Sequence, residues 1–565
     1  MDNINQRIAN LSPEKRKLLQ LKLNKNVFDG HTILAKSLKE HGITHVYSIS
    51  GTPIDKTLSL CAKNNIRVIG VHHQQAAVMM AAAQNYLTGK LVAAVILSAG
   101  PAVTNSTTGI LVAQDNCFPL LVIGSRRPLE KEGIGYFQEL NAVPIFESIT
   151  KSSKLVDSTA KISQMISEGI KIAISGRPGV SYLDIPEDIL DRKIDTYNKI
   201  LSEPIQVPQP NQEVLEKAID LIKKAQRPVL IIGKGIRWSE PYQEIDFLVN
   251  NLGIPFITSP MGKGYLPDNN SLCFNAISSQ ILLSSDLILI VAARLNWTFR
   301  FGTEFAENAQ VIHIDIEPSE LGKNIIPTVG IVGDAKAVLK KIVSGLTQSK
   351  LPISNSWLNI LYSEREKKIN QWELLAQEDS LPISPHRLIK EIGESLPQDA
   401  IVVIDGRVIL QVSENILASY FPASRFTSGT NGCMGTGIPF GIGAKLSYPH
   451  RPVIVITGDT AFGFNAMEME TAIRLRLPII VIIANNQGNS GSLKQKAFYS
   501  ANYPDLVTMF QPNIRYEKIM EAFEGCTEYV ETSEQIKPAF TRALKSGIST
   551  CINVKVNPET PDPNR

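Results

Sequence analysis

Three residues in the carboxyl-terminal third of the chain have side-chain or main-chain oxygens suited to a divalent cation. Asp459 follows the apolar run VIVIT, while Asn486 and Gly488 follow the apolar run PIIVIIA, with a helix-like stretch between the two runs. The carboxyl ends of parallel strands meet at one edge of a sheet, so we expect these residues to lie together. A carboxylate, an amide oxygen and a main-chain carbonyl suit Mg²⁺ that is also bound to phosphate oxygens. We therefore predict that Asp459, Asn486 and Gly488 bind Mg²⁺ and that the metal holds a diphosphate.

The rest of the chain alternates short β-branched runs with helical stretches, which predicts an α/β fold. We predict three doubly wound parallel-sheet domains over residues 27–191, 205–347 and 380–558. Residues 1–26 form a polar N-terminal extension, in which Ser12 is a plausible cap for a short helix.

Composition excludes several classes of function. The 57 basic and 54 acidic side chains nearly balance, so charge gives no argument for a nucleic acid or an anionic membrane as partner. The six cysteines lack the paired spacing of a zinc site, and no run reaches the ~18 apolar residues of a membrane span. No glycine fingerprint of a nicotinamide-dependent dehydrogenase follows a predicted strand. We expect a cytoplasmic protein that acts on small molecules.

The predicted metal site lies within a longer pattern. Gly458 and Asp459 precede Asn485 and Asn486, with 24 residues between Thr460 and Asn485 (485 − 460 − 1). This pattern resembles the GDG and NN motif of thiamine-diphosphate (ThDP) enzymes, with Thr460 in place of the third glycine. The plainer interpretation of a lone Gly-Asp is a turn.

The order of three α/β units is similar to that of the acetolactate synthase and pyruvate oxidase superfamily. Its members have a pyrimidine-binding (PYR) domain, a central domain and a diphosphate-binding (PP) domain, which here correspond to the three predicted units. Within that superfamily, GTPIDKTL, YFQEL, GRPGVSYLDIP and SGTNGCMGTGIPFGIGA most resemble 2-hydroxyacyl-CoA lyase and oxalyl-CoA decarboxylase. The resemblance implies ThDP and Mg²⁺ as cofactors and a homodimer or homotetramer in which PYR and PP domains of different subunits meet. It implies cofactor contacts at Gly458, Asp459, Thr460, Ala461, Met434, Gly432, Asn486, Asn489 and Ser490, with Met434 as the apolar wedge that bends the cofactor.

At the reactive end the chain departs from the family pattern. Relatives carry a glutamate in the PYR domain that assists proton transfer to the cofactor, and Gln74 stands at that position here. An amide forms hydrogen bonds but cannot take up a proton at accessible pH, so we expect slower cofactor activation and an environment that favours ligation. His73 is an alternative proton carrier, although packing or capping would equally explain it.

The segment GYFQEL implies substrate contacts at Gln138 and Tyr136, and SAGPAVTN resembles the loop over the reactive side of the cofactor. Asn489 and Ser490 replace an isoleucine-tyrosine pair of relatives, which predicts a more polar or more open pocket. The segment DGRVILQVSEN lacks the asparagine and arginine pattern of relatives that use coenzyme A, which weakens the case for tight binding of that cofactor. Whether Lys263, Arg294 or Asn296 of the central unit contacts a nucleotide stays open.

Two functions remain. The first is a ThDP- and Mg²⁺-dependent lyase or carboligase, which acts by decarboxylation, carboligation or both on a 2-oxo acid, an acyl-CoA or a carrier-protein-bound 2-hydroxyacyl thioester. The SPEKR segment resembles segments of natural-product assembly lines, which suggests such a pathway. The alternative is a non-catalytic paralogue with a scaffold or regulatory role, suggested by Gln74.

Overall fold

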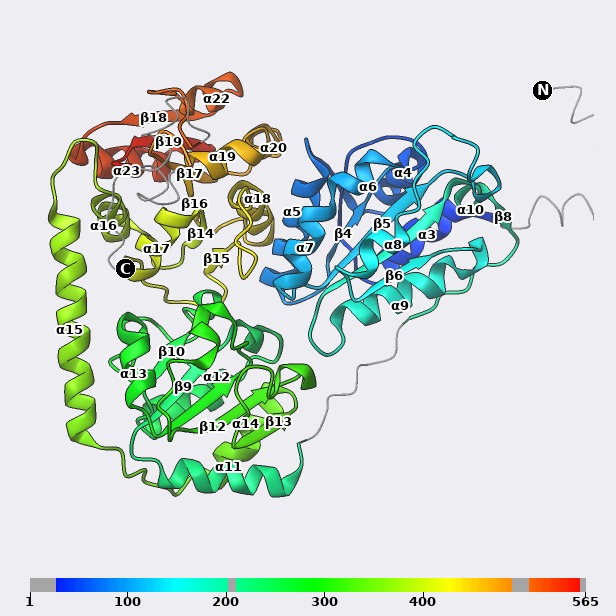
Figure 1. The fold of residues 1–565 in the computed structure, drawn as a ribbon. Helices are drawn as coiled ribbons and strands as arrows, with labels where there is room; N and C mark the ends of the chain where they lie inside the picture. The colour runs from blue at the N-terminus through cyan, green and yellow to red at the C-terminus, as the bar shows by residue number, and fades with distance from the viewer. Residues whose placement is uncertain (1–26, 202–209, 490–507, 559–565) are drawn as a thin grey trace, which may run out of the picture.

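The computed structural model describes residues 27–201, 210–489 and 508–558. The predicted N-terminal helix and Ser490 lie outside these ranges. The described chain forms three α/β units, each built on its own parallel sheet (Figure 1). The predicted fold class is confirmed.

The PYR domain has a six-stranded parallel sheet in the order β3-β2-β4-β5-β7-β6. Its strands are β2 (His45–Ser48), β3 (Arg67–Gly70), β4 (Ala93–Ile96), β5 (Leu120–Arg126), β6 (Ser152–Leu155) and β7 (Val180–Pro186). Its helices are α3 (Gly30–Glu40), α4 (Asp55–Lys63), α5 (Gln74–Thr88), α6 (Pro101–Asn105), α7 (Thr107–Asp115), α8 (Val143–Glu147), α9 (Ile162–Ile174) and α10 (Glu187–Asp191). A short antiparallel pair, β1 (Phe28–Asp29) and β8 (Lys193–Ile194), joins the two ends of the unit.

The PP domain repeats this topology, with the strand order β15-β14-β16-β17-β19-β18. Its strands are β14 (Ile401–Asp405), β15 (Arg425–Thr427), β16 (Val453–Gly458), β17 (Ile480–Asn485), β18 (Cys526–Val530) and β19 (Thr550–Lys555). Its helices are α16 (Pro385–Ser395), α17 (Arg407–Ile416), α18 (Gly437–Ser447), α19 (Asp459–Asn465), α20 (Glu468–Arg474), α22 (Glu517–Ala522) and α23 (Ile536–Ser546). The two outer domains therefore share one order of strands, in which the first strand lies second in the sheet and the fifth lies at the far edge.

The central domain has a five-stranded parallel sheet in the order β10-β9-β11-β12-β13. Its elements are β9 (Pro228–Ile232), β10 (Phe256–Thr258), β11 (Leu287–Val291), β12 (Gln310–Asp315), β13 (Val329–Val332), α11 (Gln212–Lys224), α12 (Tyr242–Asp246), α13 (Ser278–Ser284) and α14 (Ala335–Leu346). The long helix α15 (Asn355–Gln377) then runs along one side of the molecule from the central domain to the PP domain (Figure 1).

The PYR and PP domains pack on each other through α5 and α18, which face each other in Figure 1. A Cβ on Gly443 of α18 would lie 2.5 Å from the carbonyl oxygen of Met80 and 3.1 Å from Cβ of Ala83 in α5. Only a residue without a side chain permits this approach. One hydrophobic core consequently runs through both domains.

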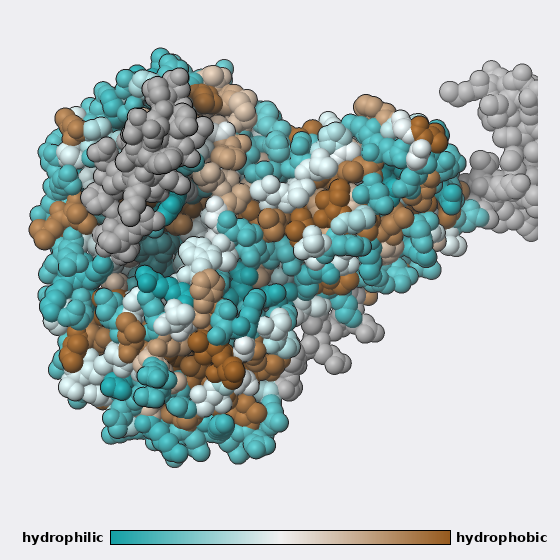
Figure 2. All heavy atoms as spheres, viewed as in Figure 1, coloured by the Kyte–Doolittle hydropathy of each residue, from teal (hydrophilic) through white to brown (hydrophobic). Residues whose placement is uncertain are grey.

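The face of the molecule drawn in Figure 2 is mixed in polarity. Hydrophilic residues cover most of each domain on this side, and hydrophobic ones are interspersed among them. Within the described ranges, no helix is both long enough and apolar enough to cross a membrane.

Candidate active site

The structure brings Asp459 and Gly488, two of the predicted metal ligands, into direct contact. Asp459 begins α19 at the carboxyl end of β16, and Gly488 follows β17, the neighbouring strand. The Asp459 carboxylate accepts hydrogen bonds from the main-chain N–H groups of Thr460 and Gly488, each at 2.8 Å. The crossing from β16 through α19 and α20 to β17 therefore places both residues at one sheet edge, as the sequence predicts.

The atoms around this pair fit a metal-bound diphosphate. Asp459 is 2% exposed, and burial raises the pKa of its carboxyl from 3.8 to about 6, so a bound cation would favour the ionised form. A Cβ on Gly458 would meet no atom of the described residues within 4 Å, so no described side chain packs against the main chain there. The Thr460 hydroxyl oxygen is buried and has no hydrogen-bond partner within the described chain. Asn486 directly follows β17 and is partly buried.

The described residues contain no cluster of three or more histidine, cysteine, aspartate or glutamate side chains that could hold a metal. The donors predicted beside Asp459 are an amide oxygen and a main-chain carbonyl oxygen. This is the mixed donor set that Mg²⁺ accepts when phosphate completes its coordination.

The glycine-rich turn that carries Met434 is held from two sides. Asp405, at the end of β14, accepts a hydrogen bond from the Gly437 N–H at 2.8 Å. Asn465 of α19 donates to the Gly435 carbonyl at 2.6 Å. Met434, the residue before Gly435, is partly buried.

Gly435 itself could not carry a side chain. Its φ is +86°, and a Cβ there would lie 2.5 Å from Cβ of Phe464. Gly432, the other predicted glycine contact of this turn, has φ +60° and is exposed, and a Cβ there would meet no described atom within 4 Å. The turn is therefore tight at Gly435 and open at Gly432.

The hydrogen bonds that join Asp405 and Asn465 to this turn were not predicted from the sequence. Asp405 carries the same signal as Asp459, since each is an aspartate at the carboxyl end of a buried strand. Burial raises the pKa of Asp405 to about 6, against the effect of several main-chain hydrogen bonds.

In the PYR domain, Gln74 is the first residue of α5 and is 9% exposed. Its Oε1 accepts a hydrogen bond from Nδ2 of Asn105 at 3.1 Å. His73 precedes it as the helix cap, and its Nδ1 accepts from the Gln75 N–H at 3.1 Å. The structure thus gives His73 the capping role, while its catalytic role stays a prediction.

Gln138 lies against the other end of the same short helix that carries Asn105. A Cβ on Gly100, the residue before α6, would lie 2.9 Å from Cβ of Gln138. Because α6 has only five residues, Gln74 and Gln138 lie near its two ends, less than about 10 Å apart along the helix axis. Two predicted site residues from distant segments are thereby brought together.

The loop that carries Gln138 is fixed by internal contacts. Glu139 accepts hydrogen bonds from the N–H groups of Gly135 and Tyr136, each at 3.1 Å. Arg127 donates to the Phe137 carbonyl at 2.9 Å. The Tyr136 ring lies 4.8 Å from the ammonium group of Lys131. Tyr136 therefore helps to shape the loop, and its predicted contact with substrate is untested.

A buried carboxylate joins the start of α5 to the PP domain. Glu468, 1% exposed on α20, accepts from the main-chain N–H groups of His72 at 2.9 Å and His73 at 3.0 Å. Its second oxygen accepts from the Thr471 hydroxyl at 2.7 Å. This contact fixes the segment immediately before Gln74.

Among the described residues, Gln74 and Gln138 make no direct hydrogen bond to Asp459 or Gly488. Asn489 is exposed directly after Gly488.

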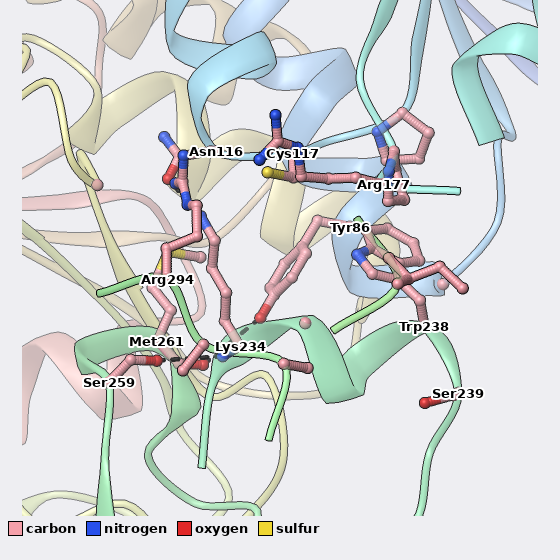
Figure 3. A pocket seen from close by; sticks show the side chains of 18 of the residues that line it. Tyr86, Asn116, Cys117, Arg177, Lys234, Trp238, Ser239, Ser259, Met261 and Arg294 are labelled. Carbon is pink, nitrogen blue, oxygen red and sulfur yellow. Dashed lines mark hydrogen bonds between the residues drawn. The ribbon is translucent and has the colours of Figure 1, made fainter. Parts of the chain in front are cut away.

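A separate cavity of about 740 Å³ lies where the three domains meet (Figure 3). Its lining includes Asn116 of the PYR domain, Lys234 and Arg294 of the central domain and Thr430 of the PP domain. Lys234 donates to Oδ1 of Asn116 at 2.8 Å, and burial lowers the pKa of the lysine to about 8. This mixture of cationic and polar groups suits an anionic ligand, but Gln74, Gln138 and Asp459 do not line the cavity.

Of the three central-domain residues considered for nucleotide contact, two line this cavity and the third is buried between domains. Arg294 and Asn296 line the cavity, and Arg294 donates to the Thr430 hydroxyl at 3.1 Å. Lys263 is buried, donates to the Glu414 carbonyl at 2.7 Å and pairs with the Glu414 carboxylate at 3.5 Å. Lys263 thus joins the central and PP domains.

Comparison with known protein families gives matches over all three units. The matching families are described as thiamine pyrophosphate enzyme N-terminal TPP binding domain (residues 28–145), central domain (residues 215–342) and C-terminal TPP binding domain (residues 410–554). Thiamine pyrophosphate is another name for ThDP.

Individual relatives match along nearly the whole chain. Human 2-hydroxyacyl-CoA lyase 1 is 31% identical, with 94% of this chain and 95% of the relative covered. The 2-hydroxyacyl-CoA lyase of Arabidopsis thaliana is 32% identical over 94% and 96%, and the oxalyl-CoA decarboxylase of Escherichia coli is 30% identical over 94% and 95%.

Proposed function

Because the chain belongs to the thiamine pyrophosphate enzyme family, we propose that it uses ThDP and Mg²⁺ to make or break a carbon-carbon bond next to a carbonyl. The observation that carries the proposal is the contact between Asp459 and Gly488 at the carboxyl ends of β16 and β17. Two predicted metal ligands converge there, at the sheet edge where parallel α/β domains bind ligands.

Residues of the PP domain would bind the metal and the diphosphate, and residues of the PYR domain would contact the cofactor and the substrate. Asp459, Asn486 and the Gly488 carbonyl would hold the metal and diphosphate, and Met434 would present an apolar surface to the rings. When bound, ThDP supplies the carbon nucleophile that adds to a carbonyl and then stores the electron pair of the broken bond. Gln74 would hydrogen-bond to the cofactor without exchanging a proton with it, and Gln138 would contact the substrate.

We propose a 2-oxo acid or a 2-hydroxyacyl thioester as substrate, with decarboxylation, carboligation or both as the reaction. Relatives named as lyases of 2-hydroxyacyl-CoA and decarboxylases of oxalyl-CoA support this substrate class. The amide at Gln74 supports ligation, since an intermediate that is slowly protonated survives long enough to meet a second carbonyl. The link to a natural-product pathway rests on the SPEKR segment, which lies outside the described residues.

Cofactor binding can be tested by thermal melting. Adding ThDP with Mg²⁺ should raise the melting temperature of the wild-type protein, because a ligand that binds only the folded state stabilises it. Asp459→Ala should abolish the rise, whereas Asp220→Ala, at an exposed position on α11, should preserve it. A wild-type protein that shows no rise at millimolar cofactor would refute the proposal.

We propose an oligomeric site in which the PYR domain of one subunit serves the PP domain of another, as the resemblance to the superfamily implies. Coexpressing Asp459→Ala with Gln74→Arg tests this arrangement. If each site combines two chains of a C2 dimer, the mixed dimer has one intact site, and a 1:1 mixture should regain about a quarter of wild-type activity. If each site forms within one chain, the mixture should stay as inactive as either parent.

Gln74 also favours a second candidate, a non-catalytic paralogue that binds ThDP as a structural ligand. Exchange of the reactive cofactor proton with deuterium distinguishes the two. Exchange on the wild-type protein above the rate of free ThDP supports an enzyme. Bound cofactor without such exchange, together with no product from 2-oxo acids, supports the paralogue.

A further inference from the structure

The loop that follows β11 in the central domain holds one residue of the PP domain through two hydrogen bonds. The indole N–H of Trp297 donates to the main-chain carbonyl of Thr430 at 2.8 Å. The guanidinium of Arg294 donates to the Thr430 hydroxyl at 3.1 Å. An indole nitrogen and a guanidinium can only donate hydrogen bonds, so the polarity of both contacts is fixed by the side chains themselves. The loop therefore holds both the main chain and the side chain of Thr430.

Thr430 belongs to a tight turn that leads directly to two predicted cofactor contacts. The Gly432 N–H donates to the Gly429 carbonyl at 3.2 Å, which closes a four-residue turn with Thr430 as its second residue. Gly429 has φ +74°, and a Cβ there would lie 1.9 Å from Oδ1 of Asn116, so the PYR domain also confines the turn. Met434 lies two residues beyond Gly432. The position of Thr430 therefore affects where Gly432 and Met434 lie.

The other end of this glycine-rich segment is held within the PP domain, by Asp405 and Asn465. Residues 431–434 connect the two held ends. Trp297 is 54% exposed, although tryptophan is highly buried on average. Because so much of its ring lies outside the core, Trp297 can be changed with little effect on folding, and its hydrogen bond to Thr430 can be tested separately.

We propose that Trp297 is a positioning residue of the cofactor site, which holds the Thr430 carbonyl so that Met434 reaches the rings of bound ThDP. The inference rests on the proposed function, because Met434 is expected to contact those rings. Trp297 would touch neither the cofactor nor the substrate and would act through the turn at residues 429–434. The central domain would thereby contribute to a site whose predicted contacts all lie in the other two domains.

Trp297→Phe removes the donor and keeps an aromatic ring. The loss of one hydrogen bond changes an equilibrium by about threefold to tenfold. Calorimetric titration with saturating Mg²⁺ should therefore show that Trp297→Phe binds ThDP at least threefold more weakly than wild type. Inorganic pyrophosphate with Mg²⁺, which resembles only the diphosphate of the cofactor, should bind the two proteins within about twofold when measured by competition with ThDP. Trp238→Phe is the matched control, because Trp238 lines the same cavity and packs on Tyr86, and it should bind both ligands like wild type.

Action through Met434 can be measured in a Met434→Ala background. There Trp297→Phe should change the affinity for ThDP by less than about twofold, since the side chain that the turn positions is absent. Hydrogen exchange reports on the turn without cofactor. The peptide over residues 428–436, followed by mass spectrometry, should exchange at least threefold faster in Trp297→Phe than in wild type or Trp238→Phe.

Three results would overturn the inference: unchanged ThDP affinity in Trp297→Phe, an equal loss of affinity for ThDP and pyrophosphate, or an equal loss in the Met434→Ala background. In each of these cases, ThDP binding by the wild-type protein upholds the proposed function. A wild-type protein that fails to bind ThDP would overturn both.

Discussion

Gly100 and Gln138 are in contact, and both have left-handed φ angles, +63° and +60°. A Cβ on Gly100 would lie 2.9 Å from the Gln138 Cβ and 3.1 Å from its carbonyl oxygen. The contact joins the loop before α6 to the loop that follows β5. It thereby sets where the predicted substrate-contacting amide lies relative to Gln74.

Gly100→Ala should therefore destabilise the PYR domain and displace Gln138. The substitution combines a strained φ, worth about 1–3 kcal/mol, with a steric clash against main-chain atoms. We expect the first thermal transition to fall by about 5 °C or more. Gly42→Ala is the matched control, because Gly42 has φ +80° but no described atom within 4 Å of where its Cβ would lie. Equal losses in the two variants would show that the Gln138 contact contributes nothing.

Gly458→Ala should separate folding from cofactor binding. Gly458 has an ordinary extended φ of −75°, and a Cβ there would have no described atom within 4 Å, so the apo protein should melt within about 1 °C of wild type. If the diphosphate binds beside Gly458, the added methyl should weaken ThDP binding at least tenfold. Calorimetric titration with ThDP and Mg²⁺ measures this, and unchanged affinity would place the diphosphate elsewhere.

The sequence predicts the elements of this fold well because strand and helix signals are local. Runs such as VIVIT and PIIVIIA are buried parallel strands, β16 and β17, and the order of strands follows the alternation with helices. Of the three α/β units that the sequence predicts, the two outer ones share one strand order, while the central one has a five-stranded sheet. Close packing of α5 on α18 at Gly443 was beyond prediction, since it depends on residues distant in the chain.

Asp405→Asn should change the pH dependence of stability. Burial raises the pKa of Asp405 from 3.8 to about 6, so the folded domain holds the proton more tightly than the unfolded chain. Its contribution to the free energy of unfolding is therefore present at low pH and is lost as pH rises through 6. Between pH 5 and 7.5, wild type should lose about 1 kcal/mol relative to Asp405→Asn. Urea unfolding of both proteins at each pH measures the difference, and parallel profiles would contradict the assignment.

Glu468→Ala should loosen the start of α5. The change removes the shared acceptor of the His72 and His73 N–H groups and leaves a cavity, at a cost of about 2–4 kcal/mol. Hydrogen exchange at residues 72–76 should accelerate at least tenfold. Glu468→Gln keeps an acceptor oxygen in the same place and should exchange within about threefold of wild type. If both variants match wild type, the carboxylate does not hold this segment.

The residues of the candidate site could be predicted from the sequence, but the contacts that hold those residues in place could not. Asp459 and Gly488 meet because both follow neighbouring strands, a relation that sequence order implies. The pairs Gln74 with Asn105 and Glu468 with His73 join segments whose approach depends on helix packing and on side-chain orientation. No local pattern encodes such contacts.

Gln74→Glu should accelerate cofactor activation. Asn105 could still donate to one carboxyl oxygen, which leaves the other to carry a proton toward the pyrimidine. General acid assistance is typically worth about 10²- to 10⁴-fold, so deuterium exchange at the reactive cofactor carbon should rise by at least 10². Gln74→Met, which has neither acid nor amide, should exchange no faster than wild type. If Gln74→Glu also exchanges at the wild-type rate while ThDP stays bound, position 74 does not face the pyrimidine, and the proton relay must be sought at His73.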